Sequence, residues 1–156
     1  MKRKINLLFL VVIASLISVC GIKNEVNARE LGENIEFSYL LTEDALIGHM
    51  GNQTRGIYLA EGDSIINKIS SNKIGAGGMT SAAVRCEVSI TSIVERQTST
   101  GWARVTSWTQ TNENAFSAMI SKSLTVGTGY YYRVRSSHYA ATDVSSSGTG
   151  ALWMGN

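Results

Sequence analysis

The feature that most constrains the fold is a strict two-residue alternation along residues 80–90, whose sequence is TSAAVRCEVSI. Five apolar residues fall on one side of this run: Ala82, Val84, Cys86, Val88 and Ile90. Because successive side chains of a strand point to opposite faces, the pattern predicts a strand with one buried face. It also predicts that Cys86 is a small buried hydrophobe rather than a reactive thiol.

Short β-like runs continue along the chain, separated by Gly, Ser, Thr and Asn. They predict further strands at residues 56–60, 65–70, 102–108, 120–126, 130–140 and 151–154. Residues 55–156 are therefore predicted to form a single all-β domain, an antiparallel β-sandwich of the immunoglobulin-like or a related kind.

Three segments between these strands predict turns or loops. A turn is expected at residues 97–101, and a polar loop is expected at residues 109–115. The stretch Gly75-Ala76-Gly77-Gly78 is not followed by the Gly-Lys-Ser/Thr of a phosphate loop, and no helical pattern opens there. We therefore expect this glycine-rich stretch to be a flexible turn.

The first 28 residues have the pattern of a secretory signal peptide. Basic residues at positions 2–4 precede an uncharged apolar run at residues 7–19, and cleavage is expected after Ala28. The run is shorter than the about 20 residues that span a membrane, so no transmembrane anchor is expected in the mature chain. The sequence thus predicts a secreted protein, and the alternative is a lipoprotein anchored through an acylated Cys20.

Residues 29–54 form an acidic arm without sustained periodicity, which we expect to be loosely ordered. Ile35, Phe37 and Tyr39 alternate, so an edge strand there is a second possibility. The whole chain has 14 basic and 12 acidic residues, and loss of the leader leaves ten against eleven, a net charge of −1. The basic pI belongs to the leader, and nucleic acid is not an expected partner.

Side chains that carry catalysis or bind metals are sparse in this sequence. There are two histidines, His49 and His138, and Cys86 is the one thiol left after cleavage, so we expect no metal and no cofactor. His138, Asp143 and a serine within residues 145–147 could be combined as a hydrolase triad, but no nucleophile elbow surrounds them. We expect His138 to be an ordinary strand-end residue, and we do not expect an enzyme.

The strongest candidate for binding is the segment GTGYYYRVRSSHYA at residues 127–140. If Tyr130 packs inward, Tyr132 and Val134 do so too, and the alternate residues of this strand face outward. The candidate binding residues lie on that outward face and on one parity of a neighbouring strand: Tyr131, Arg133, Arg135, Tyr139, Trp102, Arg104 and Trp108. Such a face suits an anionic glycan, a wall polymer or a protein. The alternative is that the arginines only pair with Glu87 or Glu95.

Five segments, KIGAGG, IVERQ, GWARVTSW, GYYYRVRSSHYA and ALWM, resemble in their order a family of small exported proteins of Gram-positive bacteria that is catalogued as a domain of unknown function. The resemblance covers most of residues 55–154. It implies export and a β-rich fold, and it assigns no activity or site residue. Residues 124–130 are also similar to the corner of an immunoglobulin or fibronectin type III sandwich, which implies an inward Tyr130 whose hydroxyl bonds the backbone upstream.

Two classes of function remain open at this point. The first is a non-catalytic secreted or surface-associated module that binds cell-wall polymer, glycan or protein. The second is a small exported antagonist, similar to a bacteriocin, that acts on membranes. Sedimentation with isolated walls would favour the first class, and leakage of liposomes would favour the second.

Overall fold

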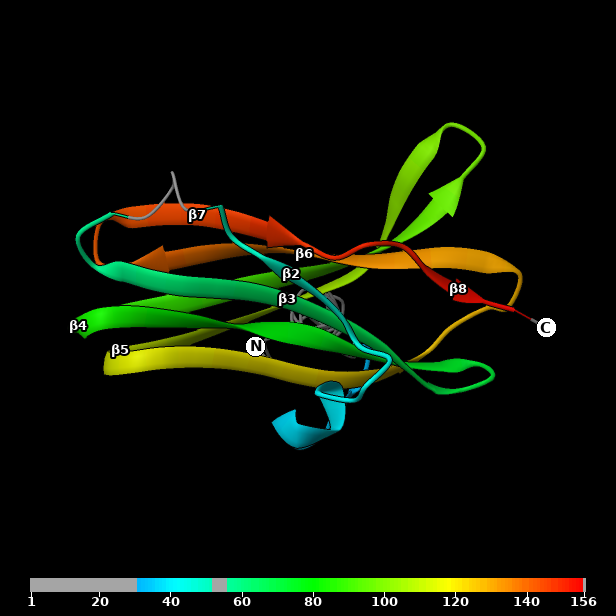
Figure 1. Cartoon of the computed structure of the whole chain (residues 1–156), viewed down its shortest axis with the longest axis horizontal. Helices are drawn as coiled ribbons and strands as arrows, with labels where there is room; N and C mark the ends of the chain where they lie inside the picture. Colours follow the sequence, from blue (N-terminus) through cyan, green and yellow to red (C-terminus); the bar gives the residue numbers. More distant parts are fainter. Residues whose placement is uncertain (1–30, 52–55, 156) are drawn as a thin grey trace, which may run out of the picture.

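The computed structural model describes residues 31–51 and 56–155, which form an antiparallel β-structure with one short 3-10 helix (Figure 1). The elements in chain order are β1 (Glu33–Asn34), η1 (Phe37–Leu40), β2 (Leu46–His49), β3 (Leu59–Ser70), β4 (Lys73–Thr98), β5 (Gly101–Thr125), β6 (Tyr130–Ala140), β7 (Asp143–Gly148) and β8 (Leu152–Met154). This architecture confirms the all-β, antiparallel prediction. The predicted signal peptide, its cleavage site and Cys20 lie outside the described residues.

β4 and β5, with 26 and 25 residues, form a long hairpin that folds back on itself. Residues 73–82 of β4 pair with β3, whereas residues 88–96 pair with β6. One layer therefore holds β1, β2, β3 and the adjoining halves of the two long strands, and the second layer holds β6, β7, β8 and the remaining halves. Both long strands turn back near their labels in Figure 1. The bend coincides with a register shift between Ser81 and Cys86.

The main core lies between these two layers and draws residues from both halves of β4. The predicted inward side of this strand is confirmed at Ala82, Val88 and Ile90, which are buried. The prediction is wrong at the bend, where Val84 is 48% exposed and Cys86 is only half-buried. β4 passes there from one layer to the other, so neither of its faces is fully covered.

Residues 109–115 continue β5, so the predicted polar loop at this position is wrong. The polar side chains of this segment bond across to β4 instead of facing a turn. The hydroxyls of Thr91 and Thr109 lie 2.8 Å apart, and Thr111 donates to Ser89 at 2.9 Å. A run of polar residues that resembles a loop in sequence is therefore the solvent-facing part of a strand pair.

The glycine-rich stretch at residues 75–78 is also strand, and the predicted flexible turn is wrong. Its glycines are buried, and they leave space for Leu40 of η1. A Cβ at Gly75 would lie 2.9 Å from Leu40 Cδ2, and a Cβ at Gly77 would lie 3.2 Å from Leu40 Cδ1. The nearest atoms to these Cβ positions belong to the neighbouring strands, Asn67 Oδ1 beside Gly75 and the carbonyl oxygen of Ile120 beside Gly77. A larger residue at either position would therefore displace β3 or β5 before it displaced η1.

The described part of the acidic arm crosses the outer face of β3, β4 and β5. β1 pairs with β5 at one side, β2 pairs with β3 at the other, and η1 lies between them. The edge strand considered for Ile35, Phe37 and Tyr39 is wrong, because residues 37–40 form η1. Instead of being loosely ordered, this part of the arm is attached to the sheet along its length.

Asn67 of β3 holds the arm against the sheet through side-chain hydrogen bonds. Its side-chain amide donates to the carbonyl oxygen of Tyr39 at 2.6 Å and to Thr42 Oγ1 at 3.3 Å. Its side-chain oxygen accepts a hydrogen bond from the backbone N–H of Gly75 at 3.1 Å. Asn67 is 1% exposed, so these bonds satisfy an amide that would otherwise be buried at a cost.

We expect Leu40→Ala to lower the free energy of unfolding by about 2–4 kcal/mol, because Leu40 is fully buried over the glycines of β4. Leu41→Ala is the matched control, since Leu41 is 54% exposed and its truncation should change the stability by less than about 0.5 kcal/mol. Urea unfolding of the two variants measures the difference. Equal losses in both would show that η1 does not depend on the contact with Gly75 and Gly77.

Candidate binding surface

The tyrosine of this segment that packs inward and bonds the backbone upstream is Tyr132, not Tyr130. Tyr132 is 2% exposed, and its hydroxyl donates to the carbonyl oxygen of Gly127 at 2.9 Å. Tyr130 is 42% exposed because it is the first residue of β6 and extends beyond the core. Its ring lies under the guanidinium of Arg96, 4.5 Å from the ring centroid. Tyr130 is on the predicted inward side of β6, in register with the buried Met154, but it is not itself buried as predicted.

Arg133 makes the cross-strand pair that was considered as the alternative to binding. Its Nε–H donates to Glu95 Oε2 at 2.7 Å, and its guanidinium lies 4.2 Å from the ring centroid of Trp102. Glu95 is in register with Arg133 on one side and with Arg104 on the other. Arg104 also bonds the hydroxyl of Ser107. Arg133 and Trp102 thus form one assembly on the outer face of the second layer.

Arg135 differs from Arg133, because it is exposed and has no ion-pair partner among the described residues. It lies on the same outward face, two residues further along β6. In register it sits opposite Ile93 on β4 and Gly148 on β7, and neither neighbour can neutralise it. Its charge therefore remains available to a ligand.

Two of the predicted site residues lie elsewhere. The register between β4 and β5 shifts after Val94, so that Trp108 faces inward although Trp102 and Arg104 face outward. Trp108 is 2% exposed, and its Nε1–H donates to the carbonyl oxygen of Leu31 at 2.7 Å. Tyr139 is half-buried and lies eight residues from Tyr131, about 26 Å along the strand.

Sequence reasoning missed Trp153 of β8, which completes the surface. Trp153 pairs in register with Tyr131, and the two ring centroids are 4.8 Å apart with planes tilted by 47°. On the other side of β6, Gln97 of β4 is in register with Trp102 of β5. An isolated tryptophan in a three-residue strand gives no periodicity, so the sequence did not show which way it points.

A hollow of about 310 Å³ opens beside these rings. It is lined by Gln97, Thr98, Ser99, Gly129, Tyr130, Tyr131 and Trp153. It lies between the tip of the long hairpin, the loop before β6, and β8. These three segments are on the right-hand side of Figure 1. The aromatic end, as we name this surface, consists of Trp102, Tyr130, Tyr131, Trp153, Arg96, Arg104, Arg133 and Arg135.

The aromatic end is basic. Four of the five described arginines belong to it, and Arg85 is the exception. Glu95 is the acidic residue placed among them, and it forms an ion pair with Arg133. Planar guanidinium groups beside aromatic rings can hold a carboxylate or phosphate and an apolar ring face at the same time.

Comparison with known proteins supports one part of the resemblance noted in the sequence, membership of a family of unknown function. Residues 29–152 match a family described as of unknown function (DUF6147). The chain belongs to this family. The match contains every residue of the aromatic end except Trp153, which follows it directly. No curated protein and no solved structure matches the chain significantly.

Two further properties of this DUF6147 chain concern metals and membranes. Within residues 31–51 and 56–155, no three residues of the types His, Cys, Asp and Glu gather closely enough to hold a metal ion. In the same part of the chain, no helix is long and apolar enough to cross a membrane.

His138 of the DUF6147 chain lies between the two layers and is fully buried. Its Nε2 is 2.7 Å from Ser147 Oγ, and its Nδ1 is 2.8 Å from Thr80 Oγ1. The carboxylate of Asp143 instead accepts hydrogen bonds from the backbone N–H groups of Tyr58, at 2.5 Å, and Leu59, at 3.0 Å. The triad considered from the sequence is therefore not assembled, and His138 joins the two layers.

The hydrogen bonds beyond Ser147 determine which nitrogen of His138 carries the proton. Ser64 donates to Ser136 at 2.9 Å, so the hydrogen between Ser64 and Ser147, 2.7 Å apart, comes from Ser147. Ser147 must then accept from Nε2–H of His138, and Nδ1 accepts from Thr80. The imidazole stays neutral because burial lowers the pKa of His138 to about 4, partly opposed by the charge of Asp63.

The unfolded chain binds a proton at His138 near pH 6.5 and the folded protein only near pH 4, so stability falls as the pH drops between these values. This residue alone accounts for a loss of about 3 kcal/mol by pH 4. We expect the stability difference between wild type and His138→Gln to shrink by that amount from pH 7 to pH 4 in urea titrations. A constant difference would contradict the assigned role of His138.

Proposed function

We propose that this protein is a non-catalytic extracellular binding module whose aromatic end binds an anionic glycan or cell-wall polymer. The observation that carries the proposal is the hollow lined by Tyr130, Tyr131 and Trp153, beside a group of arginines that a single glutamate does not neutralise. Each of these three rings is between 41% and 49% exposed. Exposed aromatic rings of this kind provide apolar faces on which sugar rings pack.

The arrangement of the rings favours an extended ligand that lies across the strands. Trp153, Tyr131 and Trp102 stand on three strands of one layer, with Gln97 on the strand between the last two. Neighbouring strands are about 4.8 Å apart, so Tyr131 and Trp102 are separated by about 10 Å. Successive sugar units of a polymer can contact successive rings at this spacing.

The arginines explain the preference for a negatively charged ligand. Arg133 and Arg135 follow Tyr131 along β6, on the face that the polymer crosses. Each is about 7 Å along the strand from the one before it. Arg133 is held in place by Glu95 and Trp102, and it orders this part of the surface. Arg135 has no such partner, and its guanidinium can form a forked contact with a carboxylate or phosphate.

We expect Tyr131→Ala and Trp153→Ala each to weaken binding to isolated cell walls or a soluble acidic glycan by about tenfold or more. Arg135→Ala should weaken it by less and reduce its dependence on salt, because a charged contact is lost. Sedimentation with walls and calorimetry with the glycan measure these effects.

Phe116→Ala and Arg85→Ala are matched controls, since Arg85 lies 4.9 Å from the ring centroid of Phe116 away from the aromatic end. Both variants should bind as the wild type does. Equal weakening by the controls, or unchanged binding in Tyr131→Ala and Trp153→Ala, would refute the proposal. Leakage of liposomes without any wall binding would support the antagonist function instead.

A further inference from the structure

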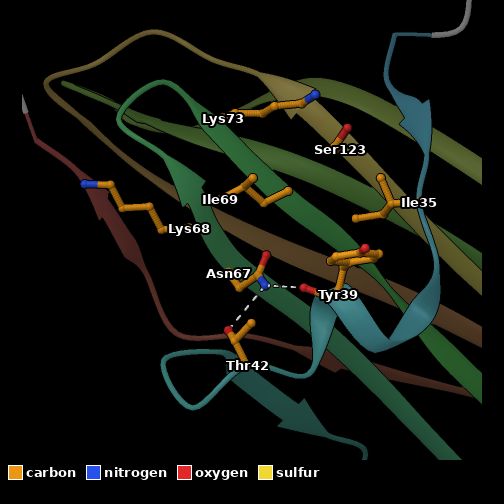
Figure 2. Close-up of a pocket in the computed structure, with 8 residues that line it drawn as sticks. All are labelled: Ile35, Tyr39, Thr42, Asn67, Lys68, Ile69, Lys73 and Ser123. Atoms are coloured by element: carbon orange, nitrogen blue, oxygen red, sulfur yellow. Dashed lines mark hydrogen bonds between the residues drawn. The ribbon is translucent and has the colours of Figure 1, made fainter.

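A second pocket lies in the other layer, under the acidic arm (Figure 2). Its volume is about 390 Å³, within the range of small-molecule sites. Three of its lining residues come from the arm and five come from β3, β4 and β5: Ile35, Tyr39, Thr42, Asn67, Lys68, Ile69, Lys73 and Ser123. The pocket is therefore the space that the arm leaves uncovered as it crosses the sheet.

The walls of this pocket are apolar. Ile35 and the ring of Tyr39 stand on the arm side, and Ile69 stands on the sheet side, as Figure 2 shows. Ile69 is 44% exposed and Tyr39 is 63% exposed, so considerable apolar surface faces water around the pocket. An apolar body inserted between them would remove this surface from water.

One end of the pocket is polar and cationic. In Figure 2 the ammonium of Lys73 and the hydroxyl of Ser123 are directed to the same end, away from Thr42. Ser123 is 2% exposed, and its hydroxyl has no hydrogen-bond partner among the described residues. Such a buried, unsatisfied hydroxyl is unfavourable unless a further group bonds to it.

The ammonium of Lys73 is available to a ligand as well. Its partner is Glu33 of β1 at 3.2 Å, and the Glu33 side chain is 80% exposed. An ion pair so open to water contributes little to stability. A ligand anion can therefore share Lys73 with Glu33, or replace Glu33, at a small cost in free energy. Lys68 lines the pocket with its stem, and in Figure 2 its ammonium extends away from the other residues.

We propose that this pocket binds a small amphipathic carboxylate. Its apolar body lies between Ile35, Tyr39 and Ile69, and its carboxylate accepts hydrogen bonds from Lys73 and, after rotation of one side-chain bond, from Ser123. The pocket is on the opposite layer from the aromatic end. The inference is therefore independent of the proposed glycan binding.

Such a ligand would bridge the arm and the sheet. Because it contacts Ile35 and Tyr39 on one side and β3, β4 and β5 on the other, it favours the attached position of the arm. A ligand that binds the folded state alone raises the unfolding temperature as its concentration increases. Thermal unfolding therefore detects occupancy of the pocket by any small molecule of this class.

The test uses octanoate, octylamine and acetate as probes of the full chain, at concentrations below micelle formation. We expect octanoate to raise the unfolding temperature and to show saturable binding in calorimetry. Acetate lacks the apolar body and octylamine carries the wrong charge, so neither should bind measurably. Equal effects of octanoate and octylamine, or no effect of octanoate, would overturn the proposal.

Two lysine variants provide matched controls for the position of the carboxylate. Lys73→Gln should weaken octanoate binding by about tenfold, because a charge-assisted contact is lost. Lys68→Gln removes the same charge from the same pocket but should leave binding unchanged, because its ammonium points away. Both lysines are at least partly exposed, so the variants should fold. Equal weakening in both would mean that only the general charge of this face acts, which would overturn the proposed position of the carboxylate.

Discussion

Two strands of this protein take part in both layers of the sandwich, and the bend that they share governs the rest of the structure. Thr80 precedes the bend in β4 and Ser92 follows it. Both belong to one buried chain of hydrogen bonds, which runs in order through His138, Ser147, Ser64 and Ser136. Hydrophobic contacts between the layers are non-directional, whereas these hydrogen bonds have preferred lengths and angles. The polar chain therefore defines how one half of β4 lies over the other.

The same bend separates the two proposed ligand-binding surfaces. The aromatic end belongs to the layer of β6 and β8, and the pocket under the arm belongs to the layer of β3 and β5. The pocket is on an outward face, and the aromatic end is on an outward face except for Tyr130 and Arg96, which lie beyond the end of the core. Neither surface therefore interrupts the core. A single small domain can in this way present a broad, shallow surface suited to a polymer and a compact pocket suited to a small molecule.

The sequence predicted those parts of the fold that depend on local alternation. The bounds of β6 and the inward side of Val88 and Ile90 follow from the period of two alone. The glycine-rich stretch could not be understood in this way, because the atoms that leave no room for a Cβ there, from Asp63, Asn67 and Ile120, belong to neighbouring strands. Trp108 was placed on the wrong face since the register shift after Val94 leaves no mark in the residue pattern. Five residues of the aromatic end were predicted: Tyr131, Arg133, Arg135, Trp102 and Arg104. Tyr130, Arg96 and Trp153 were not, and Trp153 was found only from its pairing with β6.

The acidic arm has a further consequence for how copies of this protein behave beside one another. In the path β1-β5-β4-β3-β2 both outermost strands, of two and four residues, come from the arm. Open strand edges offer unpaired backbone groups to neighbouring molecules, and short, charged edge strands discourage such pairing. The arm thus closes the layer at both sides with its own backbone, and its Glu33 places a negative charge at one edge. A segment that was predicted from its sequence to be loosely ordered therefore supplies both edge strands of this layer, an arrangement that disfavours edge-to-edge association.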